Sequence, residues 1–184
     1  MIIDFKNIVY LKQGNERQKL AYAAIVKHQV LEKLGDYNPI LTGTIPIEID
    51  LPESDLDIIC HCKDHKQFGG FLVKQFGNET DFKLATTIQN GIEATVATFS
   101  ADKFEFEIFG QNLPTEKQNA YRHMLIEHRL IVEKGSDFKQ AIIELKSKGL
   151  KTEPAFAKLL GIKGDPYVEL LKLEDNLNWK HESK

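Results

Sequence analysis

The first third of the chain alternates between helical and strand-like spacing of its hydrophobic residues. Apolar residues that recur three and four positions apart predict a helix over residues 15–34, with Gly35 as its stop. Short apolar runs bounded by polar and small residues then predict strands over residues 39–42 and 55–62. Helical spacing returns over residues 64–76. This part of the chain therefore combines helices with strands.

The middle of the chain reads as three consecutive strands. Residues 82–88 and 92–99 are rich in apolar and β-branched residues. Between them Asn90-Gly91 is a strong hairpin signal, because both residues tolerate positive φ. In a third run, residues 103–109, acidic and apolar residues alternate. The sequence therefore predicts a hairpin followed by a further strand.

After residue 114 the hydrophobic spacing is helical throughout. Four helices are predicted, over residues 115–134, 137–148, 152–160 and 165–173. Small polar residues stand where N-caps are expected, namely Thr115, Ser136, Thr152 and Asp165. We therefore expect an α+β protein, with a mixed β-sheet flanked by helices in residues 1–112 and a helical module packed on it in residues 113–184.

The composition is that of a globular protein. Of 184 residues, 42% are hydrophobic and 28% are charged, and the net charge of −3 disfavours long duplex DNA as a partner. No run of about 18 apolar residues is present, and the first residues lack the pattern of a signal peptide. Cys60 and Cys62 stand two apart on one predicted strand, where a disulfide would be strained. We therefore expect a cytoplasmic protein without a membrane partner.

Acidic residues two positions apart are candidate metal ligands, but the spacing alone carries little information. With 27 acidic residues in 184 positions, chance gives roughly four such pairs. The pairs present are Glu48/Asp50, Glu53/Asp55, Asp55/Asp57, Glu79/Asp81 and Glu105/Glu107. Only the residues around a pair can therefore distinguish a site from coincidence.

The surroundings of Asp55 and Asp57 are specific. A short predicted strand ends at Gly43-Thr44, where the missing Cβ lets the backbone approach a bound group and free N–H groups can hold phosphate. A polar loop that contains Ser54 follows. On the next strand residues two apart face the same side, so the two aspartates converge while the apolar residues beside them anchor the strand.

This arrangement resembles a known signature. Residues 41–44 read LTGT, ten residues intervene, and residues 55–58 read DLDI. The pattern is similar to that of the DNA polymerase β-like nucleotidyltransferase superfamily, as is the run PESDLD at residues 52–57. More narrowly, the stretches GTIPI, SDLDI, EIFGQ and QNAYRHM resemble the bacterial DUF4269 family. The resemblance extends along the chain and implies a nucleotidyltransferase-like sheet.

Two features depart from the superfamily pattern. Thr44 stands where serine or glycine is more usual. The loop IPIEIDLPES lacks the Arg-Gly often found there and adds Glu48, Asp50 and Glu53. These acids predict either weaker binding of a triphosphate or a different substrate.

The resemblance implies a metal site formed by carboxylates. Asp55 and Asp57 would bind Mg²⁺ or Mn²⁺, since hard cations take oxygen ligands. A third carboxylate on a later strand would join one metal and help to activate the nucleophile. Glu105 and Glu107 share one face of the strand over residues 103–109, and we favour Glu107 because it belongs to the matching EIFGQ stretch. The alternative is that both glutamates are solvated residues of an outer face.

The same resemblance assigns residues to nucleotide and substrate binding. Gly43, Thr44 and Ser54 are expected to bind the nucleotide. Further substrate contacts are expected from Glu105, Gln111, Tyr121, Arg122 and His123. For Arg122, whose planar guanidinium suits phosphate, and for His123 the alternative is a surface arginine and a hydrogen-bonded histidine between helices.

Other polar groups are expected to be structural. Residues 60–65, CHCKDH, lack the ligand spacing of a zinc site, and neither zinc nor haem nor NAD is expected as a cofactor. Lys146, Lys148 and Lys151 are predicted to be solvated residues at a helix end, where the helix dipole favours cations.

The predicted function is metal-dependent transfer of a nucleoside monophosphate from an NTP to an acceptor, which is a small molecule, a protein or an RNA end. A non-catalytic nucleotide-binding or regulatory module, for instance of toxin–antitoxin type, is the first alternative. An interaction protein in which the acids form only a polar rim is the second. The sequence leaves the base preference and the oligomeric state open, because fold membership does not settle function.

Overall fold

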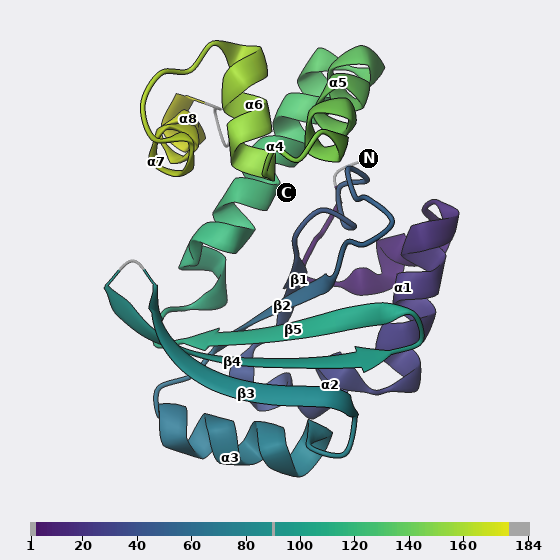
Figure 1. The fold of residues 1–184 in the computed structure, drawn as a ribbon, viewed down its shortest axis with the longest axis vertical. Helices are drawn as coiled ribbons and strands as arrows, with labels where there is room; N and C mark the ends of the chain where they lie inside the picture. The colour runs from purple at the N-terminus through teal and green to yellow at the C-terminus, as the bar shows by residue number, and fades with distance from the viewer. Residues whose placement is uncertain (1–2, 90, 177–184) are drawn as a thin grey trace, which may run out of the picture.

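A mixed β-sheet forms the middle of the protein, whose computed structural model describes residues 3–89 and 91–176 (Figure 1). The described strands lie in the order β1-β2-β5-β4-β3. Their bounds are Ile40–Thr42 for β1, Leu56–His61 for β2, Thr80–Gln89 for β3, Ile92–Ala101 for β4 and Phe104–Gln111 for β5. β2 and β5 run parallel, and the other neighbouring pairs are antiparallel. The predicted α+β class with a mixed sheet is confirmed.

Helices lie on both sides of this sheet. Those that precede or interrupt it are α1 (Glu16–Lys27), α2 (Val30–Lys33) and α3 (His65–Phe76). Those that follow it, called the helical module below, are α4 (Asn119–Lys134), α5 (Ser136–Ser147), α6 (Thr152–Leu160), α7 (Pro166–Leu171) and α8 (Leu173–Asn176). Short 3₁₀ turns span Ile8–Gln13, Gly35–Tyr37 and Thr115–Lys117. In the described part of the chain, no helix has the length and apolarity that a membrane span needs.

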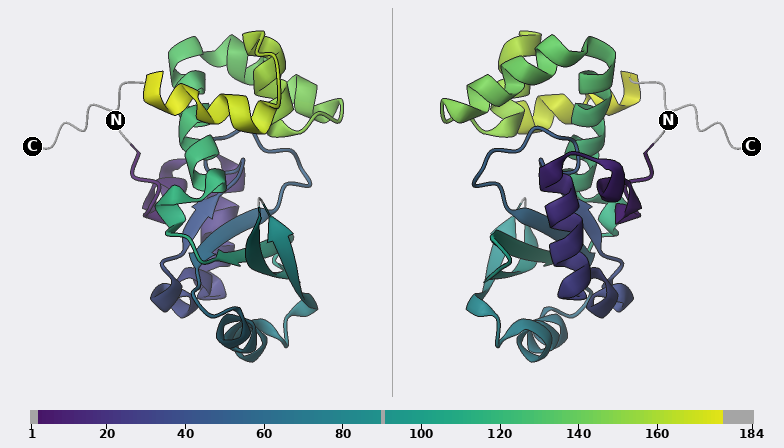
Figure 2. Two further views of the ribbon diagram at one scale, coloured as in Figure 1. Left: turned by 90° about the vertical axis from the view of Figure 1, so that its left-hand side faces the viewer. Right: turned by 90° about the vertical axis from the view of Figure 1, so that its right-hand side faces the viewer.

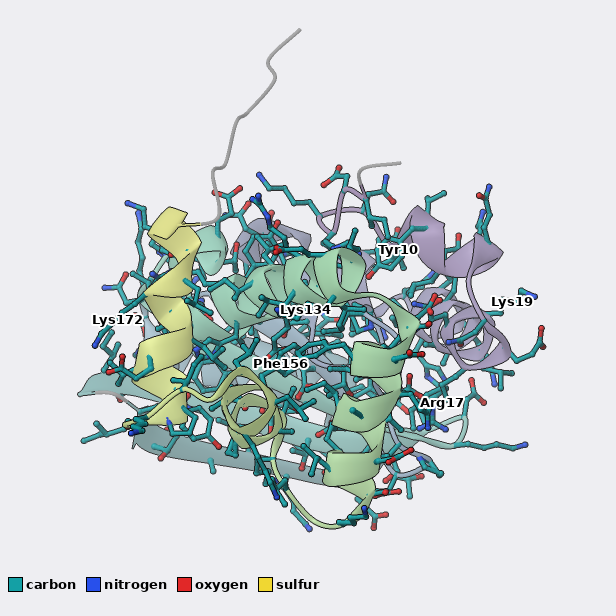
Figure 3. The ribbon with its side chains drawn as sticks, turned by 90° about the horizontal axis from the view of Figure 1, so that it is seen from above. Tyr10, Arg17, Lys19, Lys134, Phe156 and Lys172 are labelled. Carbon is teal, nitrogen blue, oxygen red and sulfur yellow. The ribbon has the colours of Figure 1, made fainter. Side chains whose placement is uncertain are left out.

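Two hydrophobic cores lie on opposite faces of the sheet, because neighbouring residues of a strand point to opposite sides. The first core buries Leu56 and Ile58 of β2 with Phe106 of β5 against α1, α2 and α3. The second buries Ile59 of β2 among residues of the helical module. Figure 2 shows α3 and the module at opposite ends of the molecule, and Figure 3 labels Phe156 within the module. Asp57 lies on the Ile59 face of β2 and is therefore on the side of the sheet that the module covers.

The helix predicted over residues 15–34 forms as two helices, α1 and α2, with a break at residues 28–29. It breaks at Gln29, which has φ 54° and so adopts the left-handed conformation. The preceding His28 has partners far along the chain: its Nε2 lies 3.0 Å from Asp102 Oδ2 and its Nδ1 lies 3.5 Å from Glu79 Oε1. These contacts with the strand ends outweigh the local helical propensity.

One of the four expected N-caps is confirmed. Asp165 accepts a hydrogen bond from the backbone N–H of Tyr167. Thr115 instead lies in a 3₁₀ turn before α4, and Ser136 and Thr152 are the first residues of α5 and α6 without a capping bond. Ser136 and Thr152 therefore mark where α5 and α6 begin, but they do not cap these helices.

The predicted hairpin is confirmed. β3 and β4 pair antiparallel, with Gln89 opposite Ile92. Gly91 has φ 76°, a conformation that glycine adopts without a steric penalty. The other turn residue of the prediction, Asn90, lies outside the described residues, as does the end of the predicted helical module, 177–184.

Candidate functional site

Asp57 and Glu107 lie opposite each other on two parallel strands. In the register of β2 and β5, Asp57 is the partner of Glu107, and on its other side Asp57 pairs with Thr42 of β1. Asp55 directly precedes β2, two residues before Asp57. Glu105 pairs with Ser100 of β4. Of the two glutamates considered from the sequence, Glu107 is the one in register with Asp57.

Gly43 makes room for the Asp57 carboxylate. Its φ is 82°, and a Cβ built on it would lie only 2.2 Å from Asp57 Oδ2. Any other residue here would both strain the backbone and displace the carboxylate. A glycine is therefore required after β1, because any side chain there would collide with Asp57.

Burial and mutual repulsion set the charge of these carboxyl groups. Burial, and after it the nearby Asp55 and Glu107, raises the pKa of Asp57 to about 8, against an opposing effect of Lys146. Burial also raises the pKa of Glu107, with Asp55 as the next cause. Near neutral pH the protein alone therefore keeps a proton on this cluster, and a bound cation would favour its release.

The donor set suits a hard cation. Asp55, Asp57 and Glu107 all carry carboxylates, the oxygen ligands that Mg²⁺ and Mn²⁺ take. Across residues 3–89 and 91–176, however, no group of three or more His, Cys, Asp or Glu side chains is arranged to hold a metal ion as it stands. Binding a metal here therefore requires the three side chains to turn toward a common point.

A pair of hydroxyl groups closes the loop between β1 and β2. Thr44 Oγ1 donates to Ser54 Oγ at 3.3 Å, and Ser54 Oγ also accepts from the backbone N–H of Leu51 at 2.9 Å. Arg17 of α1 donates to the Ser54 carbonyl at 2.8 Å. The hydroxyl groups of Thr44 and Ser54 therefore hold the two ends of this loop together.

The acids of this loop are largely paired with cations of the same protein. Lys139 Nζ of α5 lies 2.5 Å from Glu48 Oε2, and Arg17 Nε lies 3.8 Å from Asp50 Oδ2; Arg17 is labelled in Figure 3. Glu53 lines the cleft described next. Two of the three added acids are thus partly neutralised, which reduces the repulsion that the sequence suggested for a triphosphate.

A cleft of about 630 Å³ opens between this edge of the sheet and the helical module. Its walls come from β2, β5, the loop between β1 and β2, and helices α4 to α6. The predicted site residues that line it are Gly43, Thr44, Ser54, Asp55, Asp57, Glu107, Gln111 and His123. The structure therefore brings the predicted carboxylates and the predicted nucleotide-binding residues to one cavity.

Three predicted substrate contacts lie elsewhere in the described structure. Tyr121 is packed in the second hydrophobic core. Arg122 is paired with Glu174 of α8, whose Oε2 lies 2.5 Å from its Nη2. Glu105 is exposed near the turn between β4 and β5. For Arg122 this geometry matches the structural alternative rather than a contact in the cleft.

Three buried polar residues of the cleft were missed by the sequence reasoning. Lys146, predicted to be solvated, is only 8% exposed and donates from Nζ to the carbonyl of Ile49 at 2.5 Å. Gln118 and Glu127 are 2% and 4% exposed and also line the cleft. Lys146 and Glu127 follow buried Ile142 and Met124 at helical spacing, and that position on an apolar stripe was the available signal.

Comparison with known families identifies the chain. The profile of the domain of unknown function DUF4269 matches residues 23–173, which is most of the sequence. The chain belongs to the DUF4269 family. A comparison with curated proteins gives no significant match.

Solved structures similar to this DUF4269 chain share its fold. The Cid1 poly(U) polymerase with MgGTP bound matches at a TM-score of 0.52 and 12% identity, over 76% of this chain and 46% of that chain. The form with Mg 3′-dATP bound matches at a TM-score of 0.52 and 14% identity, over 84% of this chain and 47% of that chain. A point mutant of Cid1 bound to MgATP matches at a TM-score of 0.52 and 13% identity, over 89% of this chain and 53% of that chain. The chain spans about half the length of these structures, and the likeness establishes a nucleotidyltransferase fold.

Proposed function

We propose that the protein transfers a nucleoside monophosphate from an NTP to an acceptor in this cleft, with Mg²⁺ or Mn²⁺ held by Asp55, Asp57 and Glu107. The observation that carries the proposal is the register of β2 and β5, which sets Glu107 opposite Asp57, together with the packing of Gly43 against the Asp57 carboxylate. The Cid1 structures with MgGTP and MgATP support an NTP as the donor.

Each residue has a distinct role in the proposed reaction. Asp55, Asp57 and Glu107 would hold a divalent cation, which would neutralise charge at the oxygens of an in-line displacement at phosphorus. Gly43 lets the Asp57 carboxylate lie against the backbone beside the triphosphate, and Thr44 and Ser54 keep the loop closed there. Glu107 accepts the proton of the acceptor hydroxyl as the new P–O bond forms and pyrophosphate leaves.

The acceptor stays open among a small molecule, a protein and an RNA end. A Cid1 structure with its short product ApU supports an RNA end as one class. The helical module forms the wall of the cleft opposite the carboxylates, so we assign acceptor selection to it. A cytoplasmic location, where NTPs are abundant, is part of the same proposal.

Transfer from labelled NTPs tests the function directly. The purified protein is incubated with α-labelled NTPs and Mg²⁺ or Mn²⁺, and released pyrophosphate and transferred label are measured. Asp57→Asn and Glu107→Gln are each expected to lower the rate by about a hundredfold or more. Glu105→Gln is the matched control, because Glu105 lies on the same strand outside the described cleft lining, and it should keep the wild-type rate.

Two results would redirect the proposal. A rise in melting temperature with Mg²⁺-NTP but no product with any acceptor would indicate a non-catalytic nucleotide-binding module. If the double variant Asp55→Ala, Asp57→Ala still binds Mg²⁺-NTP, the assignment of the metal site is wrong. If no nucleotide changes the melting temperature, the protein is better explained as an interaction protein in which the acids form a polar rim.

A further inference from the structure

One wall of the cleft follows a line of side chains along β5, leading away from the carboxylates. Glu107, Phe109 and Gln111 are two residues apart, share one face of the strand and all line the cleft. Four strand residues span about 13 Å, a distance comparable with the length of a nucleoside. Ile59, the register partner of Phe109, and Met124 of α4 also line this stretch. Beyond the metal-binding end, the cleft thus has an apolar floor that ends in amide groups.

Gln118 is a fixed acceptor at the far end of this line. Its Nε2 donates to the carbonyls of Cys60 and Leu113, both at 2.9 Å. Because both partners only accept hydrogen bonds, the amide nitrogen must point at them, and the orientation of the side chain is determined. Gln118 Oε1 is buried and has no hydrogen-bond partner among the described residues. The side chain is only 2% exposed and lines the cleft.

The neighbouring amide of the same wall is already engaged. Gln111 Nε2 donates to the carbonyl of Gln89 at 3.4 Å, where the hairpin of β3 and β4 borders the cleft. A buried acceptor without a partner lowers stability. Gln118 Oε1 is therefore suited to a ligand that brings an N–H donor to this end of the cleft.

Building on the NTP-dependent function proposed above, we propose that the hairpin end of the cleft binds the nucleobase of the NTP and that Gln118 Oε1 accepts a hydrogen bond from its exocyclic amino group. Phe109 and Ile59 form the apolar surface under the base. Adenine and cytosine carry an amino group at the edge where hypoxanthine and uracil carry a carbonyl oxygen. A carbonyl there would face the lone pairs of Gln118 Oε1, so the protein selects an amino-bearing base.

Nucleotide pairs that differ only at this group test the inference on the unaltered protein. Affinities for ATP against ITP, and for CTP against UTP, are measured with Mg²⁺ by calorimetry or by the shift in melting temperature. In at least one pair the amino-bearing nucleotide should bind roughly tenfold more tightly. Equal affinity within both pairs, or tighter binding of ITP and UTP, overturns the inference.

A protein variant then assigns the selectivity to its residue. Gln118→Met keeps the length of the side chain and removes the acceptor, and it should reduce the ATP/ITP or CTP/UTP ratio to about one. Asn119→Ala is the control, since Asn119 lines the same end but its Oδ1 accepts from Arg122 Nη1 at 3.4 Å; the ratio should persist. Loss of the ratio in both variants overturns the assignment to Gln118.

The two proposals fail in different ways. If none of the four nucleotides binds, the proposed nucleotidyl transfer fails and the base subsite fails with it. If all four bind equally or are turned over equally, the transferase survives and only the role of Gln118 is lost. If Gln118→Met does not fold, as its melting curve would show, the nucleotide pairs on the unaltered protein still decide.

Discussion

The two walls of the cleft carry their polar residues in different ways. On the sheet, β1, β2 and β5 alternate chemistry with packing, so that Asp57 and Glu107 face the cleft while their neighbours fill the opposite core. In the helical module, Glu127 and Lys146 interrupt the apolar stripes of α4 and α5. A strand therefore displays a site as a local motif, whereas a helix hides it among core positions.

The largest expected effect concerns the sheet wall. Gly43→Ala should lower nucleotidyl transfer by about a hundredfold, because its Cβ would lie 2.2 Å from Asp57 Oδ2 and displace the carboxylate. Gly91→Ala is a matched control: its φ of 76° imposes similar strain, but an added Cβ meets no described atom within 4 Å. Rates and melting temperatures of both variants separate the two effects, and equal loss of activity in both would contradict the role of the contact.

The next effect compares two lysines of α5 that reach the same loop. Lys146→Met leaves the Ile49 carbonyl without its donor and should lower the free energy of unfolding by about 1–3 kcal/mol. Lys139→Met removes a partly exposed ion pair with Glu48 and should change the free energy of unfolding by less than about 1 kcal/mol. Urea denaturation of both variants measures the difference. Equal effects would show that burial does not distinguish the two contacts.

A third test uses the pH dependence that Glu127 contributes. Burial, with Glu153 of α6 as the second cause, raises the pKa of Glu127 well above its ordinary value, while Lys146 of α5 opposes this. The folded protein therefore holds the proton more tightly than the unfolded chain, and stability is lost as the pH rises from the unfolded toward the folded pKa, by at most about 1.4 kcal/mol per pH unit. Glu127→Gln should flatten this decline.

Melting temperatures of the wild type and of Glu127→Gln between about pH 5 and 8 check the expectation. Glu133→Gln serves as the control, because Glu133 is an exposed residue of the same helix. Parallel curves for the wild type and Glu127→Gln would mean that Glu127 does not hold its proton in the folded protein.

The smallest effect is expected at Arg122. Its pair with Glu174 is about 30% exposed on both sides, at 31% and 29%, and such pairs contribute about 0–1 kcal/mol. Arg122→Ala should therefore leave both the affinity for Mg²⁺-NTP and the transfer rate near the wild-type values. A tenfold loss of affinity would restore the sequence-based hypothesis that this arginine contacts the substrate.

The sequence predicted the fold class because that inference depends on local hydrophobic spacing. It singled out Asp55 and Asp57 by the residues around them and by the resemblance to a family signature, and their role as metal ligands stays a prediction. It placed Glu105 and Glu107 on one strand, but the choice between them depends on the parallel register of β2 and β5, which no local pattern encodes. The break at Gln29 escaped prediction for the same reason, since the partners of His28 lie more than fifty residues away in the sequence, at Glu79 and Asp102.

Lys146 shows the limit of reading charge as exposure. A lysine near a helix end is usually solvated, yet here α5 packs so that its ammonium group meets the carbonyl of Ile49. The burial of a long cationic side chain depends on which loop lies beneath it, and that loop is about a hundred residues earlier in the sequence. For Glu127 the position on the apolar stripe of α4 was the available signal. The burial of Gln118 depends on its contacts with Cys60 and Leu113.

The loop between β1 and β2 is held from both sides, by Arg17 and Gln18 of α1 and by Lys139 and Lys146 of α5. This double attachment bears on how such a protein can diversify. A foreign helical bundle joined to the same sheet would not preserve the loop unless it also supplied equivalent lysines. Under the proposed function, new acceptor specificities should therefore arise by substitutions within the existing module rather than by exchange of the whole module.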